Sequence, residues 1–209
     1  MATRPDTATF VTPEEYLAYD WESDSRNEYL DGRIIEITAT SPRHSLILAN
    51  LTGSLVSQLR DEGCRVYCPG LRVAAARPRR ETNYFSPDLV VQCGELQTDA
   101  DRQGLRMLNP AVIVEELSPS TADYDRGTKW EHYRNIASLQ DYLLVAQAEP
   151  RIERYTRHGE RFWLFNELTE LEDVVQLDSI GCTLALRDVY ENAFDAPAET
   201  GTQTETEHG

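Results

Sequence analysis

The chain has 209 residues, of which 40% are hydrophobic and 27% are charged, and its formal net charge is −16. This length and composition fit one globular domain with a sizeable buried core. Four of the acids lie in the tail from Asp195 onward, which leaves a net charge of −12 on the rest. Nucleic-acid binders draw much of their affinity from Lys and Arg. The charge therefore excludes a protein that coats DNA, and nucleic-acid contact would depend on metal ions or on a local patch such as Arg77, Arg79 and Arg80.

No apolar run approaches the length of a membrane span, and the N-terminus lacks the basic start and apolar stretch of a secretory signal. We therefore expect a cytoplasmic protein without a membrane partner. The four cysteines form no disulfide-dense pattern, so we expect free thiols. Cys64 and Cys68 are four residues apart, but no second close Cys or His pair completes a zinc site.

The first elements can be placed from their end signals. We expect a flexible lead-in over 1–11, and Thr12-Pro13-Glu14-Glu15 predicts a helix that runs to about residue 20. Asp31-Gly32 lies between two apolar pairs and predicts a β-hairpin, because a tight turn needs positive φ. Ser41-Pro42 then precedes the longest predicted helix, about 43–62, which Gly63 ends.

After Gly63 the periodicity changes from helical to extended. The predicted strands cover 65–67, 71–75, 88–92, 111–117, 142–146, 151–157, 162–166 and 174–177. Helices are predicted at about 123–137 and 186–194, with a polar loop at 94–108 and a disordered acidic tail at 195–209. This order predicts a single α/β domain over 12–194, in which helices flank a mixed central sheet.

Asp88 and Glu115 are the first candidates for a functional site. Each carboxylate lies in or at the start of an apolar strand, where an ionised group is costly unless it is paired or bound to metal. Adjacent strands would bring the two acids close together, and the like charges favour a cation between them. Mg²⁺ takes oxygen ligands and keeps several waters, so it is the natural occupant, with Mn²⁺ as the alternative.

Lys129 is a candidate for the same site. Asp125, Lys129 and Tyr133 are spaced by four, so a helix would align them along one face, although a solvated face with an Asp–Lys pair has the same pattern. Lys129 could orient a water and balance charge on an attacked phosphate. Glu28, just before the hairpin turn, and His44, in the first turn of the long helix, are further candidates that each have an ordinary surface or helix-start interpretation.

Six short blocks in succession carry a resemblance to a known family. They are Glu28-Tyr29-Leu30-Asp31-Gly32, Ser41-Pro42-Arg43-His44, Pro87-Asp88, residues 114–121 (VEELSPST), the series Asp125, Lys129, Tyr133, and Asp141-Tyr142. In this order they resemble the Uma-type putative restriction endonuclease family, a branch of the PD-(D/E)XK nuclease superfamily. The resemblance covers about residues 12–192. It implies a restriction-endonuclease-like core, with a mixed sheet flanked by helices and metal-dependent hydrolysis at its edge.

The resemblance also implies roles for individual residues. Asp88 matches the acid of the PD element, Glu115 the second acid, Lys129 a lysine moved onto the following helix, and Glu28 an N-terminal acid. The strand lysine of the wider superfamily would fall at Leu117, so Lys129 has to substitute for it. Glu116 stands where the family usually has an apolar residue. Because Glu115 and Glu116 alternate between faces, Glu116 would offer a metal at most its carbonyl.

The predicted function is a Mg²⁺- or Mn²⁺-dependent endonuclease that acts on nucleic acid, with DNA the expected substrate. In it Asp88 and Glu115 bind metal, Lys129 and Glu28 assist catalysis, and His44, Asp125 and Tyr133 contact substrate or support the site. The alternative is a catalytically weak or inactive nuclease fold that serves as a binding or regulatory module. A homodimer is expected on the ground that duplex cleavage needs two sites. The sequence contains no phosphate-binding loop, dinucleotide fingerprint or nucleophile elbow.

Overall fold

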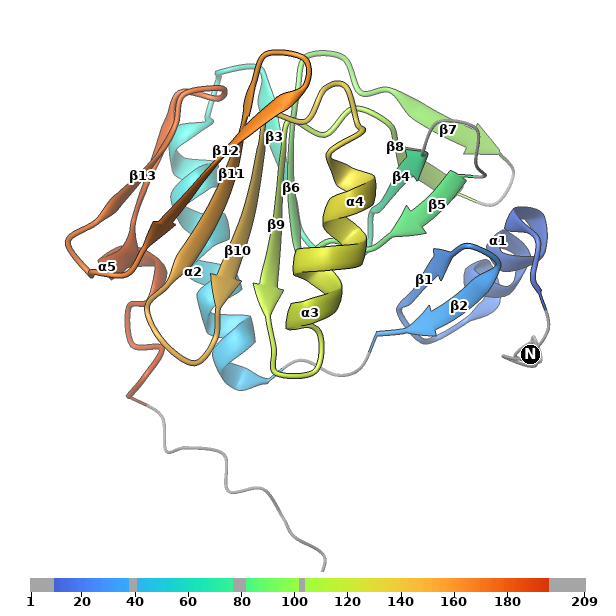
Figure 1. Ribbon diagram of the computed structural model, residues 1–209, viewed down its shortest axis with the longest axis horizontal. Helices are drawn as coiled ribbons and strands as arrows, with labels where there is room; N and C mark the ends of the chain where they lie inside the picture. The colour runs from blue at the N-terminus through green and yellow to red at the C-terminus, as the bar shows by residue number, and fades with distance from the viewer. Residues whose placement is uncertain (1–9, 38–40, 77–81, 102–103, 196–209) are drawn as a thin grey trace, which may run out of the picture.

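The computed structural model describes residues 10–37, 41–76, 82–101 and 104–195 (Figure 1). Nearly all of the predicted lead-in and tail lie outside these ranges, as do the arginines at 77, 79 and 80. Among the described residues, no helix combines the length and the hydropathy that crossing a membrane would require.

The N-terminal elements follow their predicted signals. Helix α1 (Pro13–Glu22) starts with a capping box, in which the Glu15 backbone N–H donates to Thr12 Oγ1 and the Thr12 N–H donates to Glu15 Oε2. Strands β1 (Asn27–Leu30) and β2 (Arg33–Glu36) form the hairpin, and both Asp31 and Gly32 have positive φ in its turn.

Helix α2 (Pro42–Gln58) is the longest helix, and Ser41 caps it by accepting the His44 backbone N–H. It ends four residues before the predicted boundary. The backbone turns at Leu59, and Asp61 already has positive φ before Gly63 does. The stop signal at Gly63 therefore marks the end of the turn and not the end of the helix.

The strands form two six-stranded sheets and one two-stranded sheet. In order across the sheet, the central one contains β12 (Phe162–Leu168), β11 (Ile152–His158), β10 (Asp141–Ala146), β9 (Val112–Leu117), β6 (Leu89–Cys93) and β3 (Cys64–Tyr67). The second contains β2, β1, β5 (Thr82–Phe85), β4 (Arg72–Ala76), β8 (Gly104–Met107) and β7 (Thr98–Asp101). Each is mixed, since β9 and β10 pair in parallel, as do β4 and β8.

The two faces of the central sheet are covered by different helices (Figure 1). On one face α2 packs Ile47, Leu51 and Leu55 against apolar residues of the central strands, among them Val112 and Val114 of β9. On the other face a helical segment follows β9, made of α3 (Ala122–Tyr124), a π-helical turn η1 (Asp125–Lys129) and α4 (Trp130–Tyr133). The predicted α/β class, with helices flanking a mixed sheet, is confirmed.

Three predicted elements are corrected by the structure. The polar loop at 94–108 contains the β7–β8 hairpin, which adds to the second sheet through the pairing of β8 with β4. The helix predicted over 123–137 is interrupted by the π turn and ends at Tyr133. The last helix, α5 (Leu186–Val189), is one turn long and follows a hairpin of β13 (Val174–Leu177) and β14 (Cys182–Ala185).

The expectation of four free thiols is wrong for one pair. Cys64 and Cys93 form a disulfide across the paired strands β3 and β6, where they lie opposite each other. The two are 29 residues apart, so only the pairing of these strands brings them together. Cys68 is free and exposed, and Cys182 is free and buried. Because two of the four cysteines form a disulfide, the cysteines do not support a reducing compartment. The cytoplasmic location stays a prediction.

Candidate active site

The antiparallel pairing of β6 with β9 brings the two predicted metal-binding acids together. Leu89 lies opposite Val114, so Asp88, which precedes β6, falls beside Glu115. Asp88 Oδ2 accepts the backbone N–H of Glu116 at 2.9 Å, which ties the loop before β6 to β9. Both acids are buried, with relative exposures of 7% for Asp88 and 2% for Glu115.

Lys129 approaches Glu115 from the helical segment over the sheet. Its Nζ lies 3.0 Å from Glu115 Oε1 and 3.1 Å from both Glu28 Oε1 and Asp125 Oδ1. An ammonium group has three N–H donors, so the three carboxylates can use all of them. Lys129 is the last residue of the π turn and is the only lysine in the chain. Such turns are frequent at functional sites.

Glu28 and Tyr133 complete the surroundings of Lys129 and Glu115. Glu28 Oε1 accepts the backbone N–H of Ser86 at 3.0 Å, and its Oε2 accepts the Tyr124 hydroxyl at 3.0 Å. The Tyr133 hydroxyl donates to Glu115 Oε1 at 2.9 Å. The predicted candidates Glu28, Asp125, Lys129 and Tyr133 thus meet Glu115 in one buried network.

The electrostatics of this network show a shortage of positive charge. Burial lowers the pKa of Lys129, but the carboxylates of Glu115, Glu28 and Asp125 outweigh burial and raise it well above its usual value. Burial also raises the pKa of Glu115, against the opposing effect of Lys129, and Asp125 and Asp88 raise it further. Lys129 is therefore firmly charged, and it does not by itself offset the acids around it.

Glu116 lies on the opposite face of β9, toward α2. The predicted alternation of Glu115 and Glu116 is therefore found, and the metal-ligand role of the Glu116 carbonyl stays a prediction. Its Oε2 is 3.2 Å from Nδ1 of His44, yet neither carboxylate oxygen has a hydrogen-bond partner within the described ranges. Burial, helped by Asp88, raises the pKa of Glu116 to about 9.

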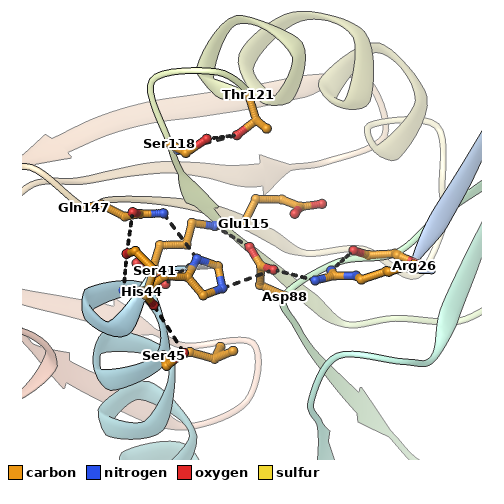
Figure 2. A network of polar contacts seen from close by, with 12 residues as sticks. Arg26, Ser41, His44, Ser45, Asp88, Glu115, Ser118, Thr121 and Gln147 are labelled. Carbon is orange, nitrogen blue, oxygen red and sulfur yellow. Dashed lines mark hydrogen bonds and ion pairs between the residues drawn. The ribbon is translucent and has the colours of Figure 1, made fainter. Parts of the chain in front are cut away.

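His44 lies on the same side of β9 as Glu116, next to Asp88 and Gln147 (Figure 2). Its Nε2 is 3.6 Å from Asp88 Oδ1, and Gln147 Nε2 lies 3.2 Å from its Nδ1. The Ser41 hydroxyl in turn donates to Gln147 Oε1 at 3.3 Å. Burial lowers the pKa of His44, while Asp88 opposes this effect. His44 and Asp88 are thereby in contact, whereas Lys129 belongs to the other face.

Arg26 is a member of the site that sequence reasoning missed. Its Nη1 lies 3.2 Å from Asp88 Oδ1, and its Nη2 donates to the Ser86 carbonyl, opposite His44 in Figure 2. The signal was available, because Arg26 is two residues before Glu28 and residues two apart in a strand share a face. The Gln147 contact had no such signal, since it depends on the parallel pairing of β10 with β9.

A cleft of about 240 Å³ lies between the start of α2 and the helical segment after β9, and the site residues that line it are Arg26, His44, Asp88, Glu115, Glu116, Asp125, Lys129 and Gln147. No group of three His, Cys, Asp or Glu side chains converges for metal binding in the described part of the chain. A cation that keeps several waters needs fewer side chains. Asp88, Glu115 and the Glu116 carbonyl offer oxygens of that kind, and both oxygens of the Glu116 carboxylate are buried without a hydrogen-bond partner among the described residues. The donor set fits a hard divalent cation.

Residues 13–187 match the Uma2 family, described as a putative restriction endonuclease. The chain belongs to this family. Among curated relatives it is 33% identical over 162 residues to the uncharacterized protein sll1609 of Synechocystis sp., a match that covers 78% of this chain and 89% of that protein. It is 32% identical over 181 residues to the uncharacterized protein slr1290 of the same organism, covering 86% and 91%.

The fold of this Uma2 protein is also found in a crystal structure described as a putative nuclease of family DUF820 from Anabaena variabilis. The two superpose with a TM-score of 0.69 at 18% identity, covering 88% of this chain and 99% of the other. At that identity the likeness shows a shared fold. It confirms the predicted restriction-endonuclease-like architecture, and the roles of the site residues stay predictions.

Proposed function

We propose that this Uma2 protein is a divalent-metal-dependent endonuclease that hydrolyses phosphodiester bonds in DNA. The observation that supports the proposal most strongly is the meeting of Asp88, Glu115 and Lys129 in one cleft of a member of this family. Lys129 reaches Glu115 from the helix, so the absence of a strand lysine at Leu117 does not leave the cleft without one.

Asp88 and Glu115 would hold Mg²⁺ or Mn²⁺, with the Glu116 carbonyl as a further oxygen ligand. When bound, the ion supplies Lewis-acid polarisation of the phosphate and a water of lowered pKa. The acids are pre-positioned for this role. The Glu116 N–H fixes Asp88, and Tyr133 and Lys129 fix the Glu115 oxygen that they share.

Lys129 is charged and stands beside Glu115, where it balances negative charge that develops on the attacked phosphate. Glu28 and Asp125 act through Lys129, since the carboxylate of each lies 3.1 Å from its Nζ and fixes the direction of the ammonium. Both are therefore positioning residues. Buried charged groups held in this way need no reorganisation during the reaction.

Plasmid cleavage in Mg²⁺ or Mn²⁺ tests the proposal. Asp88→Asn keeps the shape of the side chain and removes its charge, and we expect cleavage to fall ~100-fold or more. Asp178→Asn is a matched control, because Asp178 is exposed on the turn between β13 and β14. Cleavage that survives Asp88→Asn at the level of the control would refute the assignment.

A binding or regulatory module is the second candidate. It is favoured by the net charge of −16 and by the lack of three converging side-chain ligands among the described residues. Calorimetric titration with Mn²⁺ separates the two candidates. Binding that is lost in Asp88→Asn supports the nuclease, and no binding at millimolar Mn²⁺ supports the module. The expected homodimer can be checked by sedimentation of the full chain.

A further inference from the structure

The cleft holds few cations for a substrate that is a polyanion. Its only Lys, Arg or His side chains among the described lining residues are Arg26, His44 and Lys129. Lys129 has three carboxylates at hydrogen-bond distance, and its side chain is only 5% exposed. The side chain of His44 is 7% exposed, and its ring nitrogens face Asp88, Glu116 and Gln147. Neither side chain is placed to bind a phosphate directly, so Lys129 would act on the attacked phosphate through its charge alone.

Arg26 differs from both in exposure and in the use of its donors. Its side chain is 22% exposed, and its partners are the Asp88 carboxylate and the Ser86 carbonyl. A guanidinium has five N–H donors in a planar fork that matches the oxygens of a phosphate. The backbone of Arg26 is anchored, because its carbonyl accepts the Ile37 N–H at 2.8 Å. A change of partner therefore requires only side-chain movement.

The position of Arg26 also suits a nucleic-acid backbone. A second, more apolar groove of about 750 Å³ lies beside the cleft along α2 from His44 to Gly53, and Arg26, Ile37 and His44 line both cavities. Arg26 thus lies at the junction of the two cavities, where a nucleic-acid strand that passes through the cleft would continue into the groove. A phosphodiester at this junction would lie next to Asp88.

Asp88 is both the ion-pair partner of Arg26 and a ligand of the proposed metal ion. Arg26 now supplies the positive charge beside Asp88 Oδ1, and a divalent ion bound to Asp88 would supply that charge instead. Two cations at one carboxylate repel each other, so metal binding weakens the hold of Asp88 on the guanidinium. The guanidinium then needs a new anion, and the substrate phosphate is the anion that arrives in the same cleft.

Resting on the proposed function, we propose that Arg26 forms the phosphate-binding site of the cleft. Asp88 holds the guanidinium while no divalent ion is bound. Once the ion binds, Arg26 transfers to non-bridging oxygens of the phosphodiester. The ligand class is a phosphodiester of the nucleic-acid backbone, recognised by charge and by the two-pronged geometry of arginine.

The first test measures DNA binding without turnover. A fluorescein-labelled DNA duplex is titrated with the full chain in Ca²⁺, and binding is followed by anisotropy at several salt concentrations. We expect Arg26→Gln to weaken binding ~10-fold or more, and to reduce the slope of log affinity against log salt by about one. Arg26→Lys keeps the charge and loses the fork, so the slope should be retained while affinity falls less. Arg187→Gln removes the same charge from an exposed arginine and should match the wild type.

The second test measures the competition at Asp88 directly. In calorimetry with Mn²⁺ and no DNA, Arg26→Gln should bind the ion several-fold more tightly than the wild type, because a competing cation is gone. Weaker Mn²⁺ binding in Arg26→Gln would overturn the proposal, since Arg26 would then be orienting Asp88 as a ligand. If Arg26→Gln does not fold, Arg26→Lys decides by its salt slope and affinity.

The outcomes distinguish this inference from the proposed function. If the wild type cleaves DNA and Arg26→Gln binds and cleaves like Arg187→Gln, the phosphate site is wrong and the nuclease stands. If the wild type binds Mn²⁺ but neither binds nor cleaves DNA, both are wrong. A selective loss of DNA affinity in Arg26→Gln, with tighter Mn²⁺ binding, supports the phosphate site.

Discussion

The two faces of β9 give neighbouring carboxylates opposite surroundings. Glu115 faces the helical segment and contacts the ammonium of Lys129 and the hydroxyl of Tyr133. Glu116 faces α2, where the imidazole of His44 is its only ion-pair partner among the described residues and none of them forms a hydrogen bond with its carboxylate oxygens. On one face the carboxyl group of Glu115 belongs to a network of charged side chains, and on the other the carboxyl group of Glu116 is buried without such a network.

This difference shows why burial alone does not define a site. A buried charge is retained at low cost only where partners satisfy it, and otherwise its ionised form is disfavoured. Glu115 is held by a cation and an O–H donor, so the position of its carboxylate is fixed. Burial raises the pKa of both carboxyl groups, but only at Glu115 does a cation oppose the rise, and the pKa of Glu116 reaches about 9. The difference between the two faces can be tested by removing a partner of Glu115 on one face or the carboxyl group of Glu116 on the other.

The largest effect is expected from Lys129→Met. It leaves Glu28, Glu115 and Asp125 buried without their shared cation, and breaking a buried ion pair costs ~3–5 kcal/mol of unfolding free energy. Denaturant unfolding measures the change. Arg60→Met, which removes an exposed cation at the start of the turn after α2, should leave stability unchanged. A Lys129→Met protein as stable as this control would show that the network does not depend on the ammonium.

A pH-dependent effect of opposite sign is expected from Glu116→Gln. The pKa of Glu116 is about 9 in the folded protein, so between the ordinary value and 9 the folded state holds a proton that the unfolded state lacks. Stability of the wild type therefore falls as pH rises through this window, by at most ~1.4 kcal/mol per pH unit from this group. Glu116→Gln removes that loss.

The measurement is the unfolding free energy in chelator from pH 5 to pH 9. The advantage of Glu116→Gln over the wild type should grow with pH, and the exposed Glu160→Gln should show no such trend. An advantage that is constant or shrinks with pH would mean that Glu116 is ionised in the folded protein and that the two faces are alike.

The smallest effect is expected from Tyr133→Phe, which removes the hydroxyl that donates to Glu115. A lost hydrogen bond to a charged acceptor costs ~1.5–3 kcal/mol, and Lys129 still holds the same oxygen. We expect a lower unfolding free energy and weaker Mn²⁺ binding, with cleavage reduced less than in Asp88→Asn. Mn²⁺ affinity equal to that of the wild type would show that Tyr133 supports the fold and not the metal ligand.

Much of the local structure follows from the sequence. The capping box at Thr12, the hairpin turn at Asp31-Gly32 and the N-cap at Ser41 depend on residues within a few positions of one another. The separation of Glu115 from Glu116 has the same origin, because alternation is a property of any strand. The π turn was not predictable, since Asp125, Lys129 and Tyr133 have ordinary helical spacing and the Asp125 carbonyl is satisfied by the distant Tyr142.

What the sequence alone determined is the N-terminal helix and hairpin, the start of the long helix, most of the central strands, the acids Asp88 and Glu115 as a pair, and Lys129 as their partner. What only the tertiary structure decided are the contacts that join distant segments: the Cys64–Cys93 disulfide, the meeting of Glu28 with Lys129, and Arg26 beside Asp88. Local signals act through neighbouring backbone atoms, whereas these contacts depend on the register of paired strands and on a helix packed over them. The two acids could therefore be read from the chain as a candidate pair, whereas the contact of Arg26 with Asp88 needed the folded chain.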